Sequence, residues 1–378
     1  MRRRVALTGV ALILVAVAAF FLRRGPAAQH YRSGLTQVEQ GRLAEALSAF
    51  QKAVEARPDF AEAHDQIGVV YARQGRYEAA ANAFRRAIQA RPGFAEAHYH
   101  LGLLFAAQGA TGRAVSAFRE AVRADPRLAD AHNQLGLLFA RAGQHGEALS
   151  AFRKAVEVRP DFAEAHNNLG LTLAAQLQLE EAVRAFSRAV EVRPGFADAY
   201  YNMGMAFGKM GQAARAIASF EKAVELRPEF VEARTLLGWA YTRVGRHDAA
   251  ILALQRAIAD RPDYADAHYH LGKACAELGR TAEAMEAYRT ALTLRPDHAQ
   301  AWVDLGLACA AQRDLAGAIS AFEKAIALHP GSSEAHFGLG NAYLRSGRRE
   351  EGQREMAVFR QLKAEEARRE RYDRQRMR

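Results

Sequence analysis

Residues Ala61–Phe94 read AEAHDQIGVVYARQGRYEAAANAFRRAIQARPGF, and this stretch recurs along the chain. Its eighth residue, Gly68, is followed by a glycine at every 34th position up to Gly340. Proline recurs at the same interval from Pro58 to Pro330. No insertion or deletion interrupts the spacing, so we expect tandem copies of one supersecondary unit that bury their apolar faces against each other.

Counting back from Gly68 places ten units of this length in residues 27–366. The first half of each unit has apolar residues or glycine at positions 7, 8 and 11, and the second half has them at positions 20, 24 and 27. This spacing predicts one apolar stripe on each of two helices. Between the halves lies a glycine suited to a helix C-terminus, as at Gly75 and Gly109. Each unit is therefore predicted to be a helix, a tight turn and a second helix.

An apolar residue at 7, Gly at 8, an aromatic at 11, Ala at 20, Phe at 24, Ala at 27 and Pro at 32 resemble the tetratricopeptide repeat. The resemblance covers residues 27–366 and implies an all-α solenoid, a right-handed superhelix of helix-turn-helix repeats. The first and last units depart from the pattern, with Ser33 at position 7 of the first and Gly352 and Phe359 in place of alanines in the last. Such departures suit terminal units, which cap the core on one side.

The resemblance also implies where a ligand binds, because several positions of the first helix line the concave groove that holds peptides in this family. The residues of this chain that we expect in a peptide-binding groove are Gln66, Arg73, Tyr99, His100, Leu103, Asn133, Gln134, Leu137, Asn167, Asn168, Leu171, Tyr201, Asn202, Met205, Trp239 and Tyr269. Amides can hydrogen-bond an extended backbone, and leucine and tyrosine can form apolar pockets beside it. We expect the strongest contacts between Tyr99 and Tyr201.

Two binding modes of the family can be compared with this chain. The clamp for C-terminal carboxylates requires Asn at position 9, where this chain has apolar residues such as Leu103, so that clamp is not expected. The repeats are similar to those of O-linked N-acetylglucosamine transferase, whose asparagine ladder uses position 6. Only Asn168 and Asn202 match that ladder, and the catalytic region of the transferase has no counterpart here.

The N-terminal segment has a different character. Residues 5–22 read VALTGVALILVAVAAFFL and contain no charge. Eighteen residues of helix cover about 27 Å, which is sufficient for a bilayer core. A cleaved secretory signal is the alternative, but the apolar run continues past the small residues around Ala18. We expect residues 1–26 to be an uncleaved anchor and linker. Three arginines flank the run on each side, and the N-terminal amine tips the balance towards a single-pass bacterial inner-membrane protein with its repeats on the periplasmic side.

The formal net charge of +10 is concentrated at the two ends of the chain. Five arginines precede Gly25, and residues 360–378 hold eight Lys or Arg against four Asp or Glu, so about +1 remains for the repeats. The repeats thus lack the basic composition typical of nucleic-acid binding, and we expect no nucleic-acid partner. Residues 367–378 form a charged C-terminal tail. We expect this tail to be solvated, with docking to anionic lipid or an acidic partner as the alternative.

We expect no enzyme, no cofactor and no metal site. Only residues 1–26 and 367–378 lie outside the repeats, and they are too few for a catalytic domain. Six of the thirteen histidines stand at position 4 of units two to ten, where we expect packing with a hydrated polar tip and loosening of the stack at acidic pH. Acidic residues at position 2, such as Glu62 and Asp130, suit either a helix dipole or a basic peptide. Cys275 and Cys309 are expected to be buried free thiols.

These observations predict a membrane-tethered scaffold or adaptor that binds an extended segment of another protein. The alternative is a substrate-recruiting or assembly subunit of an envelope enzyme complex, such as that of a glycosyltransferase. The sequence identifies neither the partner nor the oligomeric state.

Overall fold

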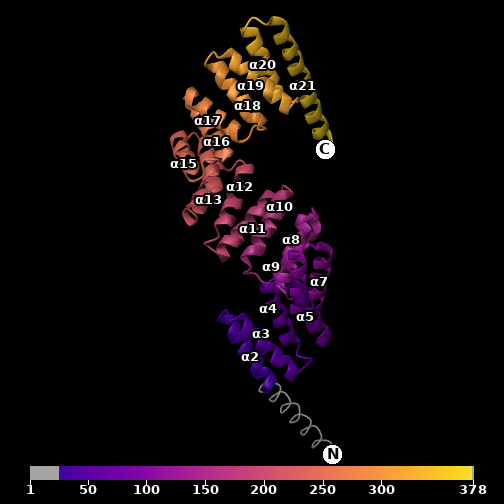
Figure 1. Ribbon diagram of the computed structural model, residues 1–378. Helices are drawn as coiled ribbons and strands as arrows, with labels where there is room; N and C mark the ends of the chain where they lie inside the picture. Colours follow the sequence, from indigo (N-terminus) through magenta and orange to yellow (C-terminus); the bar gives the residue numbers. More distant parts are fainter. Residues whose placement is uncertain (1–24, 377–378) are drawn as a thin grey trace, which may run out of the picture. The chain divides into compact units, whose positions relative to one another are not determined.

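The computed structural model describes residues 25–376, which form α-helices and no strand (Figure 1). The predicted anchor over residues 5–22 lies outside the described residues. Within residues 25–376, every helix is too short or too polar to cross a membrane.

Helices alternate along the chain as first and second helices of the predicted repeats. The first helices are α2 (Pro26–Glu39), α4 (Ala61–Arg73), α6 (Ala95–Ala107), α8 (Ala129–Arg141), α10 (Ala163–Ala175), α12 (Ala197–Lys209), α14 (Val231–Arg243), α16 (Ala265–Glu277), α18 (Ala299–Ala311) and α20 (Ser333–Arg345). The second helices are α3 (Leu43–Ala56), α5 (Tyr77–Ala90), α7 (Thr111–Ala124), α9 (His145–Val158), α11 (Leu179–Val192), α13 (Ala213–Leu226), α15 (His247–Asp260), α17 (Thr281–Leu294), α19 (Leu315–Leu328) and α21 (Arg349–Arg376).

The helices belong to two compact units. Unit 1 extends to Leu177 and holds α2 to α10, and unit 2 starts at Gln178 and holds α11 to α21. Within each unit a second helix packs on the first helix of its own repeat and on the first helix of the next, as α5 packs on α4 and α6. Successive first helices also touch, as α14 touches α16. Stability therefore comes from contacts between neighbours in sequence.

The predicted apolar stripes form the core. Ala114, Phe118 and Ala121, at positions 20, 24 and 27 of one repeat, are fully buried. The ring of Phe118 lies directly against Gly102 at position 8, where a Cβ atom would come within 2.6 Å of it. Glycine at position 8 is thus required by the close approach of the aromatic ring on the second helix.

The turn between the helices of a repeat contains a residue in the left-handed region. Eight repeats have glycine there, with φ between 71° and 86°. The other two have Leu177 and Arg313, with φ of 60° and 61°. Because a side chain is strained in this conformation, these two turns are less favourable than the glycine turns.

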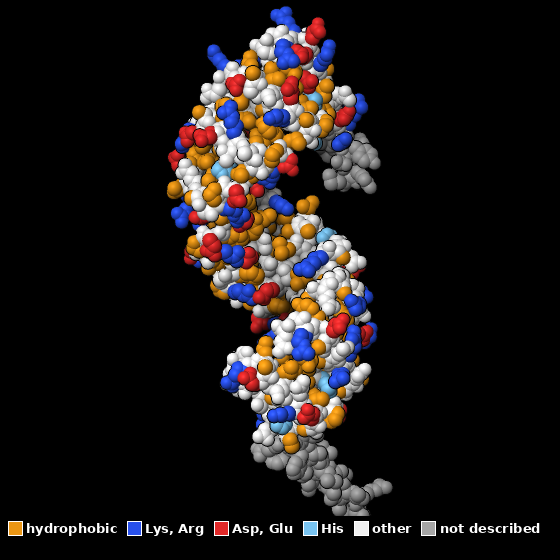
Figure 2. Space-filling view, viewed as in Figure 1, with side chains coloured by type: hydrophobic (Ala, Val, Ile, Leu, Met, Phe, Trp, Pro, Cys, Tyr) orange, Lys and Arg blue, Asp and Glu red, His pale blue; other side chains and the backbone are white. Residues whose placement is uncertain are grey.

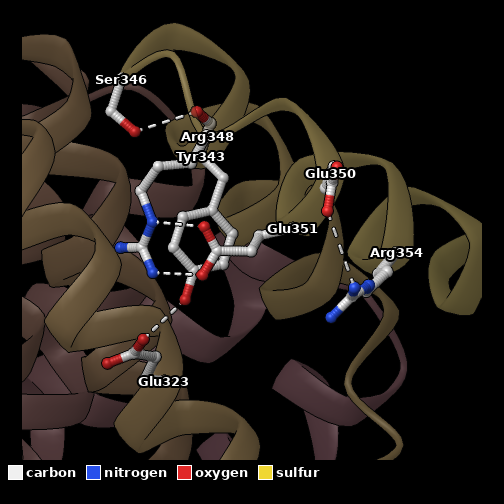
Figure 3. A network of polar contacts seen from close by, with 7 residues as sticks. All are labelled: Glu323, Tyr343, Ser346, Arg348, Glu350, Glu351 and Arg354. Atoms are coloured by element: carbon white, nitrogen blue, oxygen red, sulfur yellow. Dashed lines mark hydrogen bonds and ion pairs between the residues drawn. The ribbon is translucent and has the colours of Figure 1, made fainter.

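The last repeat ends in a longer second helix, since α21 has 28 residues where the other second helices have 14. Around the turn before it, the hydroxyl of Tyr343 donates to Glu323 over 2.7 Å, and Arg348 pairs with Glu351 (Figure 3). The ring of Phe337 on α20 lies 5.0 Å from that of Phe359 on α21. Phe359, which departs from the alanine of the repeat pattern, therefore covers the exposed face of α20, as expected of a terminal unit.

Candidate functional site

The acidic residues at position 2 are engaged within their own repeats. In most of the complete repeats this carboxylate pairs with the arginine at position 31 of the same repeat. Glu62 lies 2.6 Å from Arg91, Asp198 lies 2.6 Å from Arg227, and Asp130 and Asp266 have equivalent partners. The arginine also lies over the aromatic ring at position 34, as Arg227 lies 4.6 Å from the Phe230 ring. This arrangement supports a structural role for position 2 rather than an acidic ladder for a basic peptide.

The position-4 histidines are also bound to the fold. Nε2 of His64 lies 2.8 Å from the carbonyl oxygen of Pro58, and five other histidines at this position contact the preceding proline carbonyl at 2.9 to 3.0 Å. Trp302 takes the same position and donates from Nε1 to Pro296 over 2.8 Å. Because an indole can only donate, we assign the histidine the same role, with the proton on Nε2. The polar tip therefore bonds to backbone and is not simply hydrated.

Positions 5 and 6 connect neighbouring repeats through hydrogen bonds between residues 35 apart. Nδ1 of His100 lies 2.8 Å from Oδ1 of Asp65, and the amide nitrogen of Asn168 donates to Oδ1 of Asn133 over 3.1 Å. In unit 2 the hydroxyl of Tyr269 donates to Asp304 over 3.0 Å. Packing between repeats therefore uses these polar groups.

The tyrosines at position 5 also have partners within their own repeat. The ring of Tyr99 lies 5.7 Å from that of Phe118, and the ring of Tyr201 lies 5.0 Å from that of Phe230. Burial raises the pKa of both hydroxyls, so they stay protonated at neutral pH. Both side chains are only partly exposed.

The sixteen predicted groove residues therefore fall into three groups. Asn133 and Asn167 are buried, and His100, Asn168 and Tyr269 hold hydrogen bonds between repeats. Tyr99, Gln66, Gln134, Tyr201 and Asn202 are partly exposed. The remaining six are apolar or basic: Arg73, Leu171 and Met205 are exposed, and Leu103, Leu137 and Trp239 are partly exposed. Residues up to Leu171 belong to unit 1 and those from Tyr201 onward to unit 2, so the structure presents them as two separate sets.

The accessible apolar residues share position 9. Leu171 is 44% exposed and Met205 is 36% exposed, while Leu103, Leu137 and Trp239 are partly exposed. Leu307, also at position 9, is 43% exposed and was missing from the sequence-based set. Its position in the repeat is the signal that could have identified it.

Unit 2 also contains hollows that sequence reasoning did not find. One of about 240 Å³ is lined by Met205, Gly208, Lys209, Phe220, Leu236, Trp239 and His270. An adjoining one of about 580 Å³ is lined by Trp239, Thr242, Arg243, Tyr269, His270, Lys273 and Glu277. They come from α12, α13, α14 and α16, and they share Trp239 and His270. Side chains from three successive first helices meet here, which no single repeat reveals.

Burial shifts the pKa of His270, which lines both hollows, and of Asp304, which contacts the lining residues Tyr269 and Lys273. It lowers the pKa of His270 to about 4, so the ring is neutral at pH 7. Burial also raises the pKa of the Asp304 carboxyl. Lys273 at 3.7 Å and the hydrogen bond from the Tyr269 hydroxyl act in the opposite direction and lower that pKa. Cys275 and Cys309 are buried free thiols, as expected. Across residues 25–376, His, Cys, Asp and Glu do not gather in threes as metal ligands do.

Charges of both signs are interspersed on the face drawn in Figure 2. Exposed cations of the second helices often pair with an acid three residues away on the same helix, as Lys222 pairs with Glu225 and Arg188 with Glu191. This pairing agrees with the nearly neutral composition of the repeats.

Comparison with known proteins gives one clear result at the level of the family. Two models of the tetratricopeptide repeat match the chain, one over residues 15–59, 31–93, 66–129, 133–200, 201–259, 239–298 and 286–333, and the other over residues 310–368. No curated protein sequence matches it.

Several solved structures are similar to parts of the chain. One is YrrB, described as a TPR protein with an unusual peptide-binding site, with 27% identity, a TM-score of 0.43, and coverage of 49% of this chain and 95% of that one. MamA shows 26% identity and a TM-score of 0.42, covering 45% and 93%. The anaphase-promoting complex hetero-tetramer Cut9–Hcn1 shows 14% identity and a TM-score of 0.49, covering 91% and 95%. Since the repeat models together extend over residues 15–368, the chain belongs to the tetratricopeptide repeat family.

Proposed function

We propose that this chain is a non-catalytic scaffold that binds an extended segment of another protein along the first helices of its repeats. Tetratricopeptide repeat proteins bind other proteins or peptides, and arrays of this repeat are typically interaction scaffolds without catalytic activity. The observation that carries the proposal is the set of exposed apolar side chains at position 9, such as Leu171 and Met205. In this proposal the repeats coil into a right-handed superhelix with position 9 on its concave side.

The spacing of these residues favours an extended ligand. A single exposed leucine is unremarkable on any protein, but here a large apolar residue recurs at the same position of successive first helices. Partly exposed amides such as Gln66 and Gln134 lie three positions before them. An extended segment offers side chains to such apolar sites and backbone groups to such amides.

Photo-crosslinking in cells tests this assignment. A photoreactive phenylalanine analogue at Leu171 or Met205 should capture a defined set of proteins. The same analogue at Leu252, which is 70% exposed on the second helix α15, is the matched control. Capture of the same proteins from Leu252, or of none from either first-helix position, would remove the basis for the proposed face.

We also propose that residues 5–22 tether the chain to a bacterial inner membrane, with the repeats in the periplasm. The uncharged run supports the membrane tether, and the N-terminal amine, added to arginines that are equal in number on the two sides, supports the orientation. The full chain should stay in the membrane pellet during alkaline carbonate extraction, and a chain lacking residues 5–22 should not. Protease added to spheroplasts should digest the repeats, and their protection would show the opposite orientation.

The same crosslinking experiment addresses the alternative role as a recruiting subunit of an envelope enzyme. In that case a glycosyltransferase or similar enzyme would be captured, and its activity would fall when this chain is deleted. We propose no nucleic-acid role, since the repeats together carry only about +1.

A further inference from the structure

The two adjoining hollows of unit 2, here called the Trp239 hollow, differ in chemistry along their length. The smaller part is mainly apolar, with Met205, Phe220, Leu236 and Trp239 in its lining. The larger part is mainly polar and is lined by Arg243, Lys273 and Glu277, among others. Their shared residues, Trp239 and His270, place the apolar and polar parts side by side.

Gly208 keeps the apolar part open. It directly precedes Lys209 on α12, and a Cβ atom at this position would come within 3.1 Å of the Trp239 ring. No other repeat has glycine at this position of the first helix, where alanine is common. The glycine therefore belongs to this site and not to the general repeat pattern.

The charges around the hollow are unbalanced. Lys209, Arg243 and Lys273 contribute three cations, and Glu277 is the one acid in the lining. Lys209 and Arg243 are exposed and pair with no acid among the described residues, although the Arg243 guanidinium lies 5.7 Å from the Trp239 ring. Lys273 lies 3.7 Å from Asp304 but keeps 40% of its side chain exposed.

Several cations of the second helices are neutralised within the fold, since Lys222 and Arg188 each pair with an acid three residues away on the same helix. The fold does not use Lys209 or Arg243 in this way, so an external anionic group can pair with them. His270 adds no charge at neutral pH, so the excess comes from the lysines and the arginine.

We propose that the Trp239 hollow binds an extended acidic segment of a partner protein, with a large apolar side chain in the apolar part and Asp or Glu carboxylates against Lys209, Arg243 and Lys273. A peptide meets both requirements, because its side chains place an apolar group and carboxylates within one or two residues of each other. The inference rests on the proposed function, since it names the class of segment bound by one part of the first-helix face.

Selection from a random peptide library displayed on phage tests this inference with the full chain in detergent micelles. The enriched peptides should contain a large apolar residue flanked by Asp or Glu. Their affinity, measured by fluorescence polarisation, should fall about tenfold or more in Trp239→Ala. It should fall about three- to tenfold in Lys209→Glu and in Arg243→Glu, and these losses should shrink at high salt.

Controls separate the site from general effects. Arg184→Glu reverses an exposed charge on the second helix α11 and should leave the affinity unchanged. Lys209 and Arg243 are exposed, so their substitution tests the charge without disturbing the core. Enriched peptides that are basic, or whose binding is insensitive to Trp239, Lys209 and Arg243, would overturn this inference and leave the scaffold proposal in place. Enrichment of no peptide would count against both.

Discussion

In most repeats a residue with no side chain lies directly against an aromatic ring. Gly102 lies against Phe118, and the same pair recurs at Gly68 with Phe84 and at Gly306 with Phe322. In one repeat the pair is Gly238 with Leu254, and in another it is Gly272 with Tyr288. The rings of Phe118 and Phe322 are fully buried, so they have little room to move away from an added methyl group.

Gly102→Ala should therefore destabilise unit 1 by about 1–3 kcal/mol, because the new methyl group overlaps the Phe118 ring. Gly112→Ala is the matched control, since Gly112 lies on α7 of the same repeat with no atom near its would-be Cβ. The control should be neutral or stabilising by up to about 1 kcal/mol, because alanine favours helix. Urea unfolding followed by circular dichroism measures both, and equal midpoints would contradict the packing argument.

The largely buried imidazole of His270 makes the stability of unit 2 depend on pH. Its pKa of about 4 lies below the usual value near 6.5, so the folded state prefers the neutral ring. Asp266 works to raise this pKa, while His298, Lys273 and Arg295 work to lower it. The contribution of the neutral His270 ring to the free energy of unfolding is fully present above about pH 6.5. It is lost as the pH falls towards 4, and the total change is about 3 kcal/mol.

In His270→Gln, the fall in stability between pH 6.5 and 4 should be smaller than in the unchanged chain, because one depressed histidine pKa has been removed. Thermal unfolding at several pH values measures it. His98→Gln is the comparison, because it makes the same substitution at a position-4 histidine of unit 1 whose ring bonds to the carbonyl of Pro92. An identical pH profile for His270→Gln and the unchanged chain would show that this ring does not carry the effect.

Within the helix pair, the turn between the two helices is the part whose conformational free energy differs most from one repeat to another. Eight repeats place glycine in the left-handed region, and Arg313 has the same conformation with φ of 61°. A side chain in this region costs about 1–2 kcal/mol relative to its relaxed state. The residue after the turn compensates in part, because the Asp314 side chain accepts from the backbone nitrogen of Gly317 at the start of α19.

Arg313→Gly should stabilise the ninth repeat by about 0.5–1 kcal/mol, since relief of the strained turn exceeds the entropy that glycine adds to the unfolded chain. Gly279→Ala, in the preceding repeat with φ of 71°, should be destabilising by a similar amount. Differential scanning calorimetry of both variants measures the two shifts. Shifts of the same sign would contradict the assignment of strain to this turn.

At the scale of the whole molecule, stability is spread over neighbouring contacts, so the end of the array needs a cover. α21 packs on α20, with Met356 against Gly340 and Phe359 beside Phe337. Without α21, residues of α20 that lie against it, such as Phe337 and Leu344, would lose this cover. The network of Figure 3 would also lose Glu351, the partner of Arg348.

Removal of residues 349–378 should therefore destabilise unit 2 by at least about 2 kcal/mol, because each large apolar side chain that loses its cover contributes about 1.5–3 kcal/mol. Removal of residues 367–378 alone should change stability by less than about 0.5 kcal/mol, since surface segments contribute little. Guanidinium unfolding of the full chain and both truncations compares them. A large loss from the shorter truncation would show that the tail packs on the repeats.

The sequence by itself determined the repeat, its helices and its core. Periodicity gives these features because each repeat contacts its neighbours in a similar way, so Gly102, Phe118 and Ala121 have close counterparts in most copies. Only the three-dimensional contacts show which polar residues form hydrogen bonds between repeats and which remain available to a partner. Asn133 and His100 hold neighbouring repeats together, while Lys209 and Arg243 remain unpaired beside Trp239. The hydrogen-bond partners of Asn133 and His100 lie 35 residues away in the adjacent repeat. The pattern of a single repeat does not show which residues of neighbouring repeats meet.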